Sequence, residues 1–247
     1  MGEARGHICW TPWMRRLNRS IPSDPRCKLC DNPFGRPGSL MRFVGFGPSR
    51  LNRRICRGCI HALEKRPGGA EVELSLLFAD VRGSTALAEQ ASAEEFSRLM
   101  ARFYGAAATA VDRRNGIVDK FVGDQVVALF IPGFAGADHA ADAVAAAREL
   151  LANTGHGEGE PWIPVGAGVH TGVAFVGTVG EGDALDFTAL GDSVNTAARL
   201  ASSAGSGEIL VSSAAAAASQ LDTAGLEART LNLRGRAESV EAWIVAP

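Results

Sequence analysis

The stretch "GIVDKFVGDQVVALF", residues 116–130, places two short apolar runs on either side of a Gly-Asp pair. Both runs are rich in β-branched and aromatic residues, which favour strands. Gly123 tolerates a positive φ and Asp124 tolerates a turn, so the stretch predicts a tight β-hairpin. The hairpin would hold a carboxylate at its tip. Because a turn aspartate often only bonds its own backbone, a functional role for Asp124 depends on the rest of the chain.

Two longer patterns surround this hairpin. The segment "VELSLLFAD", residues 72–80, predicts a buried strand that ends at Asp80. Residues 92–116 predict a long amphipathic helix, with Ser92 as its N-cap and Glu95 as the capping-box partner three residues later.

The remaining segments complete an α+β pattern. Helices are expected over residues 137–155 and 192–205, and further strands in "VGAGVHTGVAFVGTVG" and near the C-terminus. The order β-α-β-β-α-β with additions predicts a ferredoxin-like fold, in which helices cover one face of an antiparallel sheet.

Length and composition are those of a globular protein. The chain has 247 residues, of which 46% are hydrophobic and 21% charged, enough for one large domain and a small module. No run of about 18 apolar residues is present, and the N-terminus lacks the apolar region of a secretory signal. We therefore expect a cytoplasmic protein.

Charge is distributed unevenly along the chain. Residues 1–66 contain 14 Lys or Arg against 4 Asp or Glu, whereas residues 67–247 contain 11 against 23. The basic part could be a solvated surface, could dock onto the acidic part, or could bind an anionic or protein partner. Sequence alone favours docking only weakly over the other two.

The cysteines lie in the basic part. Cys27 and Cys30 form one CxxC pair and Cys56 and Cys59 a second, separated by 25 residues. Two such pairs supply four thiolates to one tetrahedral ion, which indicates a structural Zn²⁺ site. An Fe–S cluster or a redox-active dithiol remains open. Cys9 is expected to be a free thiol.

A Pro/Gly break in "EKRPGGAEVE", residues 64–73, marks the predicted domain boundary. The predicted organisation is an N-terminal tail (1–25), a four-cysteine zinc-ribbon-like module (26–62), a linker (63–71) and one larger domain (72–247).

Asp80 and Asp124 are expected at one edge of the sheet, because the first strand lies beside the hairpin in this topology. Two adjacent carboxylates repel each other unless a cation separates them, which indicates a divalent metal. The turn "DVRGST", residues 80–85, leads into a helix whose N-terminal amides suit a phosphate. Asp80 as a helix cap and Gly83 as a plain turn residue are the structural alternatives.

Four segments, "LLFADVRGST", "KFVGDQVVALF", "VGAGVHTGVAFVGTVG" and "DFTALGDSVNTAARL", resemble in order and spacing the catalytic domain of the class III adenylate/guanylate cyclases. The resemblance covers about residues 72–247. It is closest to the bacterial subgroup with Thr at the purine-recognising position, and a cysteine-rich segment also precedes some actinobacterial members.

The resemblance implies an adenylate cyclase that makes 3′,5′-cyclic AMP from ATP. It implies that Asp80 and Asp124 hold two Mg²⁺ or Mn²⁺ ions. Lys120 and Thr188 would select the purine, since an ammonium donates to adenine N1, whereas guanine N1 itself carries a hydrogen. The implied triphosphate-binding turn comprises Val81, Gly83, Ser84 and Thr85.

The resemblance also implies roles for three further residues. Asn195 would orient the ribose and Arg199 would stabilise charge on the α-phosphate, for which its rigid fork of donors is suited. Arg234 matches a position that is lysine in relatives and contacts the terminal phosphates. In the family these groups meet only when two catalytic domains pair head to tail, so the chain is expected to form a homodimer.

Two other functions compete with this prediction. One is a catalytically silent nucleotide sensor or scaffold that acts through the zinc module, although the motif residues are intact. The other is a diguanylate cyclase, which is disfavoured because "FVGDQ" is not a GGDEF-type loop. His170 is expected to be a packed histidine and not a metal ligand.

Overall fold

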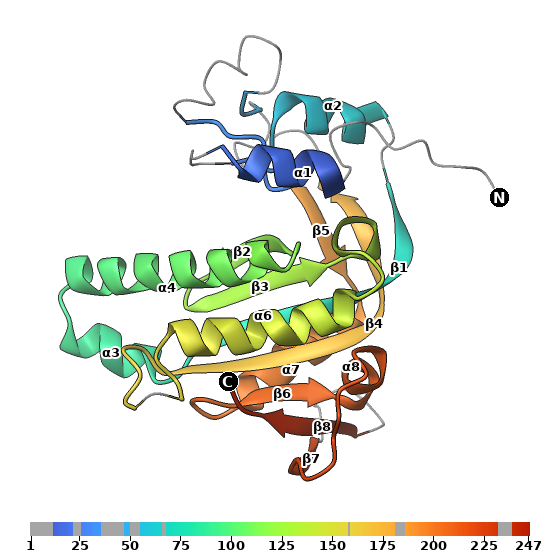
Figure 1. The fold of residues 1–247 in the computed structure, drawn as a ribbon. Helices are drawn as coiled ribbons and strands as arrows, with labels where there is room; N and C mark the ends of the chain where they lie inside the picture. Colours follow the sequence, from blue (N-terminus) through green and yellow to red (C-terminus); the bar gives the residue numbers. More distant parts are fainter. Residues whose placement is uncertain are drawn as a thin grey trace. The chain divides into compact units, whose positions relative to one another are not determined.

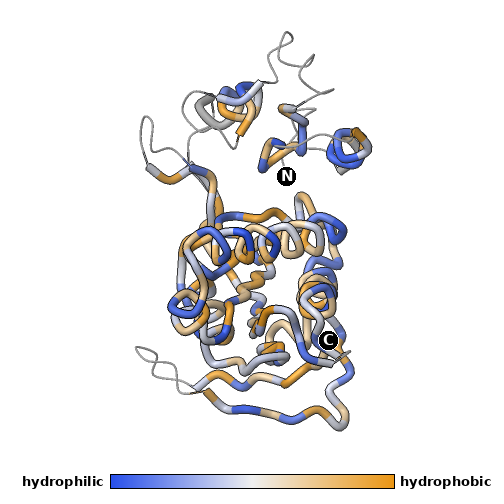
Figure 2. The backbone as a smooth tube through the Cα atoms, turned by 90° about the vertical axis from the view of Figure 1, so that its left-hand side faces the viewer, coloured by the Kyte–Doolittle hydropathy of each residue, from blue (hydrophilic) through white to orange (hydrophobic). Residues whose placement is uncertain are grey.

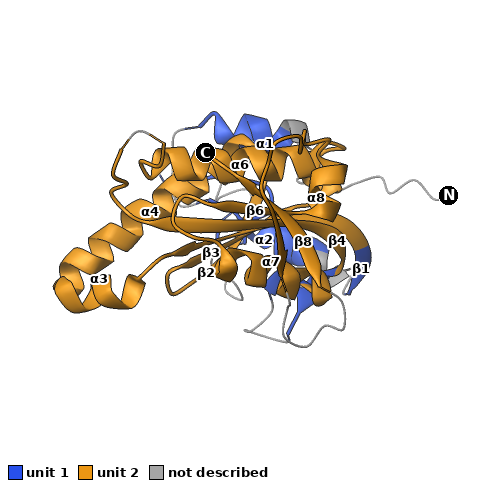
Figure 3. Ribbon diagram, turned by 90° about the horizontal axis from the view of Figure 1, so that it is seen from below, with its two compact units in different colours: residues 1–71, 175–189 blue, residues 72–174, 190–247 orange. Residues whose placement is uncertain are grey.

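The computed structural model describes residues 12–21, 26–35, 47–49, 55–65, 68–157, 159–180, 186–231 and 239–247. Cys9 and Arg234, both named above, lie outside these residues. The chain divides into two compact units (Figure 3). Unit 1 comprises residues 1–71 and 175–189, and unit 2 comprises residues 72–174 and 190–247. Residues 175–189 thus group with the N-terminal part, while the predicted domain bounds remain a prediction.

The βαββαβ order is present (Figure 1). Its elements are β1 (Gly69–Val81), α4 (Ala93–Arg113), β2 (Ile117–Val122), β3 (Gln125–Phe130), α6 (His139–Asn153) and β4 (Val165–Val179). The additions are α3 (Ser84–Gln90), α5 (Pro132–Ala135), β5 (Asp186–Leu190), α7 (Asp192–Ser203), β6 (Ile209–Ser212), α8 (Ser213–Ala218), β7 (Ala228–Leu231) and β8 (Val240–Val245). Unit 1 also contains α1 (Pro12–Arg19) and α2 (Arg57–Lys65).

Among the described strands the sheet order is β2-β3-β1-β4-β6-β8-β7, with β5 paired to β4. The predicted neighbourhood of the first strand and the hairpin is confirmed, because β1 pairs antiparallel with β3 from Ser75↔Phe130 to Asp80↔Gln125. Gly123 has φ 60°, the left-handed conformation that a tight turn requires.

Helix α4 begins at the predicted cap. The amide of Glu95 donates to the Ser92 hydroxyl at 3.3 Å, and the amide of Ser92 donates to the Glu95 carboxylate at 2.9 Å. This reciprocal pair satisfies two amides that the first turn leaves open. The helix buries one face, formed by Met100, Phe103, Ala107, Ala110 and Val111. The helical turns in Figure 2 accordingly alternate between hydrophilic and hydrophobic stretches.

Helices lie on both faces of the sheet, which corrects the expectation of one covered face. Ile209 and Val211 of β6 join the large core with α4 and α6, whereas Leu210 joins a smaller cluster with Leu200 and Ala204 at the end of α7. Successive strand residues point to opposite faces, so α7 lies on the other side.

The sheet is also not purely antiparallel. Strands β4 and β6 are parallel, with Ala167↔Ile209, Gly168↔Leu210 and Val169↔Val211 in register. Parallel neighbours need a crossover connection, and α7 lies in that connection. Gly168 permits its close approach, because a Cβ there would lie 2.3 Å from the amide nitrogen of Ala201.

None of the described helices combines the length and the apolar character needed to cross a membrane.

Candidate functional site

Strand register brings Asp80 and Asp124 together. Asp80 pairs with Gln125, and the amide of Val81 donates to the Asp124 carbonyl at 3.3 Å. Burial raises the pKa of Asp80, Arg82 opposes that shift, and the charge and hydrogen bond of Asp124 raise the pKa further. The two carboxyl groups therefore interact directly, as the topology predicted.

Arg82 was missed by the sequence analysis. Its guanidinium donates to the Asp80 carboxylate, and a second nitrogen donates to the Ser202 carbonyl at 3.1 Å. The available signal was its spacing, since residues two apart at a strand end point to the same side. Arg82 partly balances the charge of the carboxylate pair.

The raised pKa of Asp80 predicts how the metal-free protein depends on pH. The folded-state pKa of Asp80 lies above the ordinary value of 3.8. Between these two pKa values the folded protein therefore binds more protons than the unfolded chain. Stability is therefore highest below pH 3.8 with respect to this group and falls as pH rises through the raised pKa. Asp80→Asn should flatten this part of the profile.

Urea unfolding in the presence of EDTA, at several pH values from about 3 to 7, measures this effect. Asp222→Asn is the matched control, because Asp222 is an exposed turn residue. If the stability of Asp80→Asn depends on pH as that of the wild type does, the pH dependence does not come from Asp80.

A cavity of about 650 Å³ lies between α3, α4 and the β2–β3 turn. Its lining includes Asp124, Ser84 and Thr85 from the predicted site, together with Tyr104. Helix α3 starts after Gly83, which has φ 68°. The left-handed glycine turns the chain from β1 into α3, and Ser84 and Thr85 of the predicted phosphate turn line the same cavity as Asp124.

Tyr104 was also missed. Its hydroxyl donates to the Gly123 carbonyl in the hairpin turn, and its ring stacks on Phe121 with centroids 4.3 Å apart. Burial, followed by the charge of Asp124, raises the pKa of Tyr104. Spacing along one helix cannot reveal a contact with a turn 19 residues away. Tyr104 stabilises the turn that holds Asp124.

Lys120 lies next to a β-bulge. The register of β2 on β3 shifts between Val118 and Lys120, so Asp119 has no opposite residue in the ladder. The Asp119 side chain is 2% exposed and the Lys120 side chain 39%, and the Asp119 carboxylate lies 3.3 Å from the Lys120 ammonium. A bulge redirects side chains locally. Asp119, which the sequence analysis did not select, therefore constrains the direction of Lys120.

Asn195 and Arg199 share a face of α7, as their spacing predicted. Asn195 is exposed and Arg199 is half-buried, whereas the packed face of the helix consists of Ser193, Thr196, Ala197, Leu200 and Ala201. Within the described residues of one chain, neither is among those that line the cavity.

Thr188 lies in β5 and is 5% exposed. It belongs to unit 1, whereas Asp80, Lys120 and Asp124 belong to unit 2. His170 is half-buried, and its Nδ1 lies 2.8 Å from the Ser212 hydroxyl, which agrees with a packed histidine.

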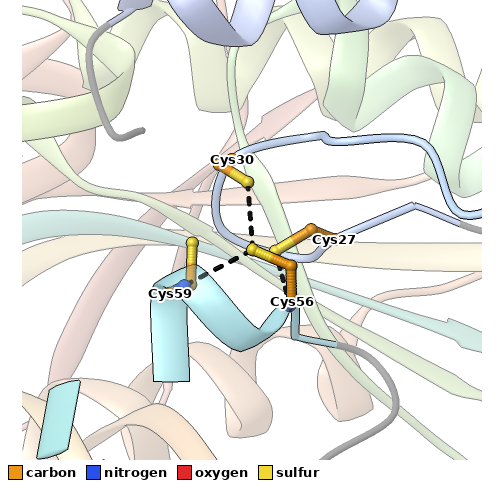
Figure 4. Close-up of side chains that lie close together, drawn as sticks. All are labelled: Cys27, Cys30, Cys56 and Cys59. Atoms are coloured by element: carbon orange, nitrogen blue, oxygen red, sulfur yellow. Dashed lines mark hydrogen bonds between the residues drawn. The ribbon is translucent and has the colours of Figure 1, made fainter. Parts of the chain in front are cut away.

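The four predicted cysteines form one cluster (Figure 4). None of the four cysteines forms a disulfide, all are buried, and their sulfur atoms lie within 4.8 Å of one another. The amide of Cys56 donates to Cys27 Sγ at 3.2 Å, and the amide of Cys59 donates to Cys56 Sγ at 3.4 Å. Contact with Cys27 raises the pKa of Cys59, because a second thiolate beside the first is unfavourable. Four cysteine sulfurs are a donor set that fits a cation with tetrahedral coordination and affinity for sulfur, such as Zn²⁺.

Comparison with known proteins places most of the chain in one family. Residues 70–246 match the family model of the adenylate and guanylate cyclase catalytic domain. An adenylate cyclase of Anabaena cylindrica is 34% identical over 169 residues, which cover 66% of this chain and 33% of that protein. The chain thus spans about a third of the length of this curated relative.

Solved structures agree with the sequence match. The guanylyl cyclase Cya2 is 27% identical with a TM-score of 0.65, and the similarity covers 72% of this chain and 93% of that one. The adenylyl cyclase CyaB from P. aeruginosa is 29% identical with a TM-score of 0.61, covering 72% of this chain and 96% of that one. The similar structures thus include both a guanylyl cyclase and an adenylyl cyclase.

Proposed function

Since the chain belongs to the adenylate and guanylate cyclase catalytic domain family, we propose that it is an adenylate cyclase that converts ATP into 3′,5′-cyclic AMP and pyrophosphate. The observation that supports this most strongly is the pairing of β1 with the hairpin, which places Asp80 beside Asp124, a residue that lines a cavity of about 650 Å³. This arrangement provides oxygen ligands and adjacent space for a polyphosphate.

The carboxylates fit two divalent ions. Asp80 and Asp124 offer hard oxygen donors. Burial and then the charge of Asp124 raise the pKa of Asp80, and a bound cation would stabilise both carboxylates. When bound, Mg²⁺ or Mn²⁺ would activate the ribose 3′-hydroxyl and neutralise charge on the triphosphate. The turn of Val81, Gly83, Ser84 and Thr85 would orient the phosphates, with the Ser84 and Thr85 hydroxyls as side-chain donors. Arg234, outside the described residues, is proposed to contact the terminal phosphates.

The α7 pair completes the proposed reaction. Asn195 would hold the ribose so that its 3′-oxygen lies in line with the α-phosphorus. Arg199 would stabilise the charge that develops on the α-phosphate oxygens, because guanidinium stays protonated and donates in a fixed fork. As these residues do not line the cavity of their own chain, a head-to-tail homodimer is proposed, in which a second subunit supplies them.

Lys120 and Thr188 are proposed to read the purine. The Lys120 ammonium would donate to adenine N1, and a guanine N1–H would present a donor to it. The buried Asp119 carboxylate 3.3 Å away restricts where that ammonium can point. ATP is therefore the proposed substrate.

Lys120→Glu tests this assignment. A carboxylate accepts from guanine N1–H and repels adenine N1, so kcat/KM for ATP should fall about 100-fold or more, while kcat/KM for GTP rises. Initial rates with each nucleotide measure the change. Arg113→Glu is the control, since it also reverses a charge but lies on the exposed side of α4, paired with Glu149. An unaltered ATP preference in Lys120→Glu would refute the role of Lys120.

A second candidate function follows from the cysteine cluster. The cluster lies outside residues 70–246, so nothing in the cyclase match requires it. A nucleotide-binding sensor without turnover, acting through a Zn²⁺-bound module, would use it directly. An anionic or protein partner of the basic N-terminal part remains a prediction. Metal analysis of the purified chain distinguishes one Zn²⁺ per chain from an Fe–S cluster.

A further inference from the structure

A buried lysine extends from the first cysteine turn to strand β5. The Lys28 side chain is 3% exposed, although it lies between Cys27 and Cys30 in a short turn. Its ammonium donates to the Phe187 carbonyl at 2.7 Å and lies 3.4 Å from the Asp186 carboxylate. A buried ammonium is costly unless such partners satisfy it. Local sequence patterns cannot predict this contact, because Lys28 and Phe187 are 159 residues apart.

The contact fixes the start of β5. The Asp186 carboxylate that faces Lys28 also accepts the Phe187 amide at 2.8 Å. The peptide between Asp186 and Phe187 is thus held through its amide by the carboxylate, while the Phe187 carbonyl is held by the ammonium. Thr188 is the next residue along this strand and is 5% exposed. A shift of the Phe187 carbonyl would displace Thr188 directly.

The cysteine cluster determines where Lys28 lies. The Cys27 amide donates to the Asn32 carbonyl at 2.9 Å, and the Asp31 amide donates to the Cys27 carbonyl at 2.9 Å, which closes the turn. The Cys56 amide donates to Cys27 Sγ at 3.2 Å and joins the second turn to the first. A metal bound by the four sulfurs would lock both turns, and with them the base of the Lys28 side chain.

Lys28 is also directly adjacent in sequence to one of the clustered cysteines. Lys28 and Leu29 are the two residues between the ligands Cys27 and Cys30. The lysine thus joins the first cysteine turn, where its backbone lies, to β5, which its ammonium contacts.

We propose that Lys28 is a positioning residue that couples metal occupancy of the cysteine cluster to purine selection by Thr188. The proposal rests on the adenylate cyclase function above and extends it to regulation of specificity. With metal bound, Lys28 holds β5 in place and the site prefers ATP. Without metal, or without the ammonium, Thr188 loses its fixed position and the preference for ATP over GTP relaxes.

Lys28→Met tests the proposal, because methionine keeps length and apolar volume but removes the donor. The readout is the ratio of kcat/KM for ATP to kcat/KM for GTP, in which any loss of folded protein cancels. We expect the ratio to fall about tenfold, as for loss of one specificity-determining polar contact. Arg113→Met, which removes an exposed cation on α4, should leave the ratio unchanged.

Metal content provides the second readout. Lys28→Met should retain the wild-type metal stoichiometry and the visible spectrum of the Co²⁺-substituted cluster, because the ligands are intact. Removing the metal from the wild-type chain with a chelator should lower the ratio to the same extent, and removing it from Lys28→Met should lower it no further. This non-additivity is the signature of one shared route.

An unchanged ratio in Lys28→Met with metal retained would overturn the proposal. If Lys28→Met does not fold, Asp186→Asn decides, since it keeps an acceptor for the Phe187 amide but removes the charge facing Lys28. Equilibrium binding of 3′-deoxy-ATP and 3′-deoxy-GTP gives the same selectivity without turnover. An inactive wild-type chain would therefore contradict the cyclase function, while the binding ratio would still decide the role of Lys28.

Discussion

Asp124→Asn should reduce cyclic AMP formation about 1,000-fold, equivalent to roughly 4 kcal/mol of lost transition-state stabilisation. Asparagine has nearly the same volume and is also accepted in tight turns, so the hairpin should persist. The Asp124 carbonyl that accepts the Val81 amide is unaffected by the change. The lost charge would leave Asp80 as the only carboxylate of the interacting pair. Turnover of ATP with Mg²⁺ or Mn²⁺, measured as cyclic AMP and pyrophosphate, gives the result.

Asp222→Asn is the matched control for this substitution. It removes the same charge from an exposed turn that follows α8, and the asparagine can still accept the Ala224 amide. It should retain wild-type turnover. Equal activity of Asp124→Asn and Asp222→Asn would show that the hairpin aspartate is only a turn former.

Mixing two inactive variants should restore activity if the sites are shared between subunits. Asp80→Ala removes a proposed metal ligand and Arg199→Ala removes the proposed charge-stabilising group, so each homodimer should be inactive. In a mixed dimer one site receives both defects and the other receives neither. Random exchange makes half of the dimers mixed, so about a quarter of wild-type activity is expected. The measurement is cyclic AMP formation by equimolar mixtures after subunit exchange.

A mixture that stays inactive, although exchange of labelled subunits is observed, would refute the shared site. A mixture of Asp80→Ala with Asp124→Asn is the internal control. Both changes affect the same proposed ligand pair, so no mixed dimer has an intact site and activity should not return.

Local signals were sufficient to predict the elements around the candidate site. The Gly-Asp turn and the capping box at Ser92 each depend on residues within a few positions, and the structure confirms both. The approach of Asp80 to Asp124 followed from topology, because the antiparallel partner of β1 is the hairpin itself.

Features that depend on distant contacts could not be predicted in this way. The parallel pairing of β4 with β6 places α7 on the second face, and periodicity within one helix does not show which face of a sheet it covers. The bulge at Asp119 is a register defect, which alternation alone cannot locate. The contact of Lys28 with Phe187 joins segments 159 residues apart.

The activity proposed for this chain is the cyclisation of ATP. The most direct measurement supplies purified wild-type protein with equal concentrations of ATP and GTP in one reaction containing Mn²⁺, and separates the products by chromatography and mass spectrometry. We expect 3′,5′-cyclic AMP and pyrophosphate in equal amounts, with cyclic GMP as a minor product. Cyclic GMP as the main product would contradict the assignment of ATP, and the absence of both cyclic nucleotides would contradict the cyclase function itself.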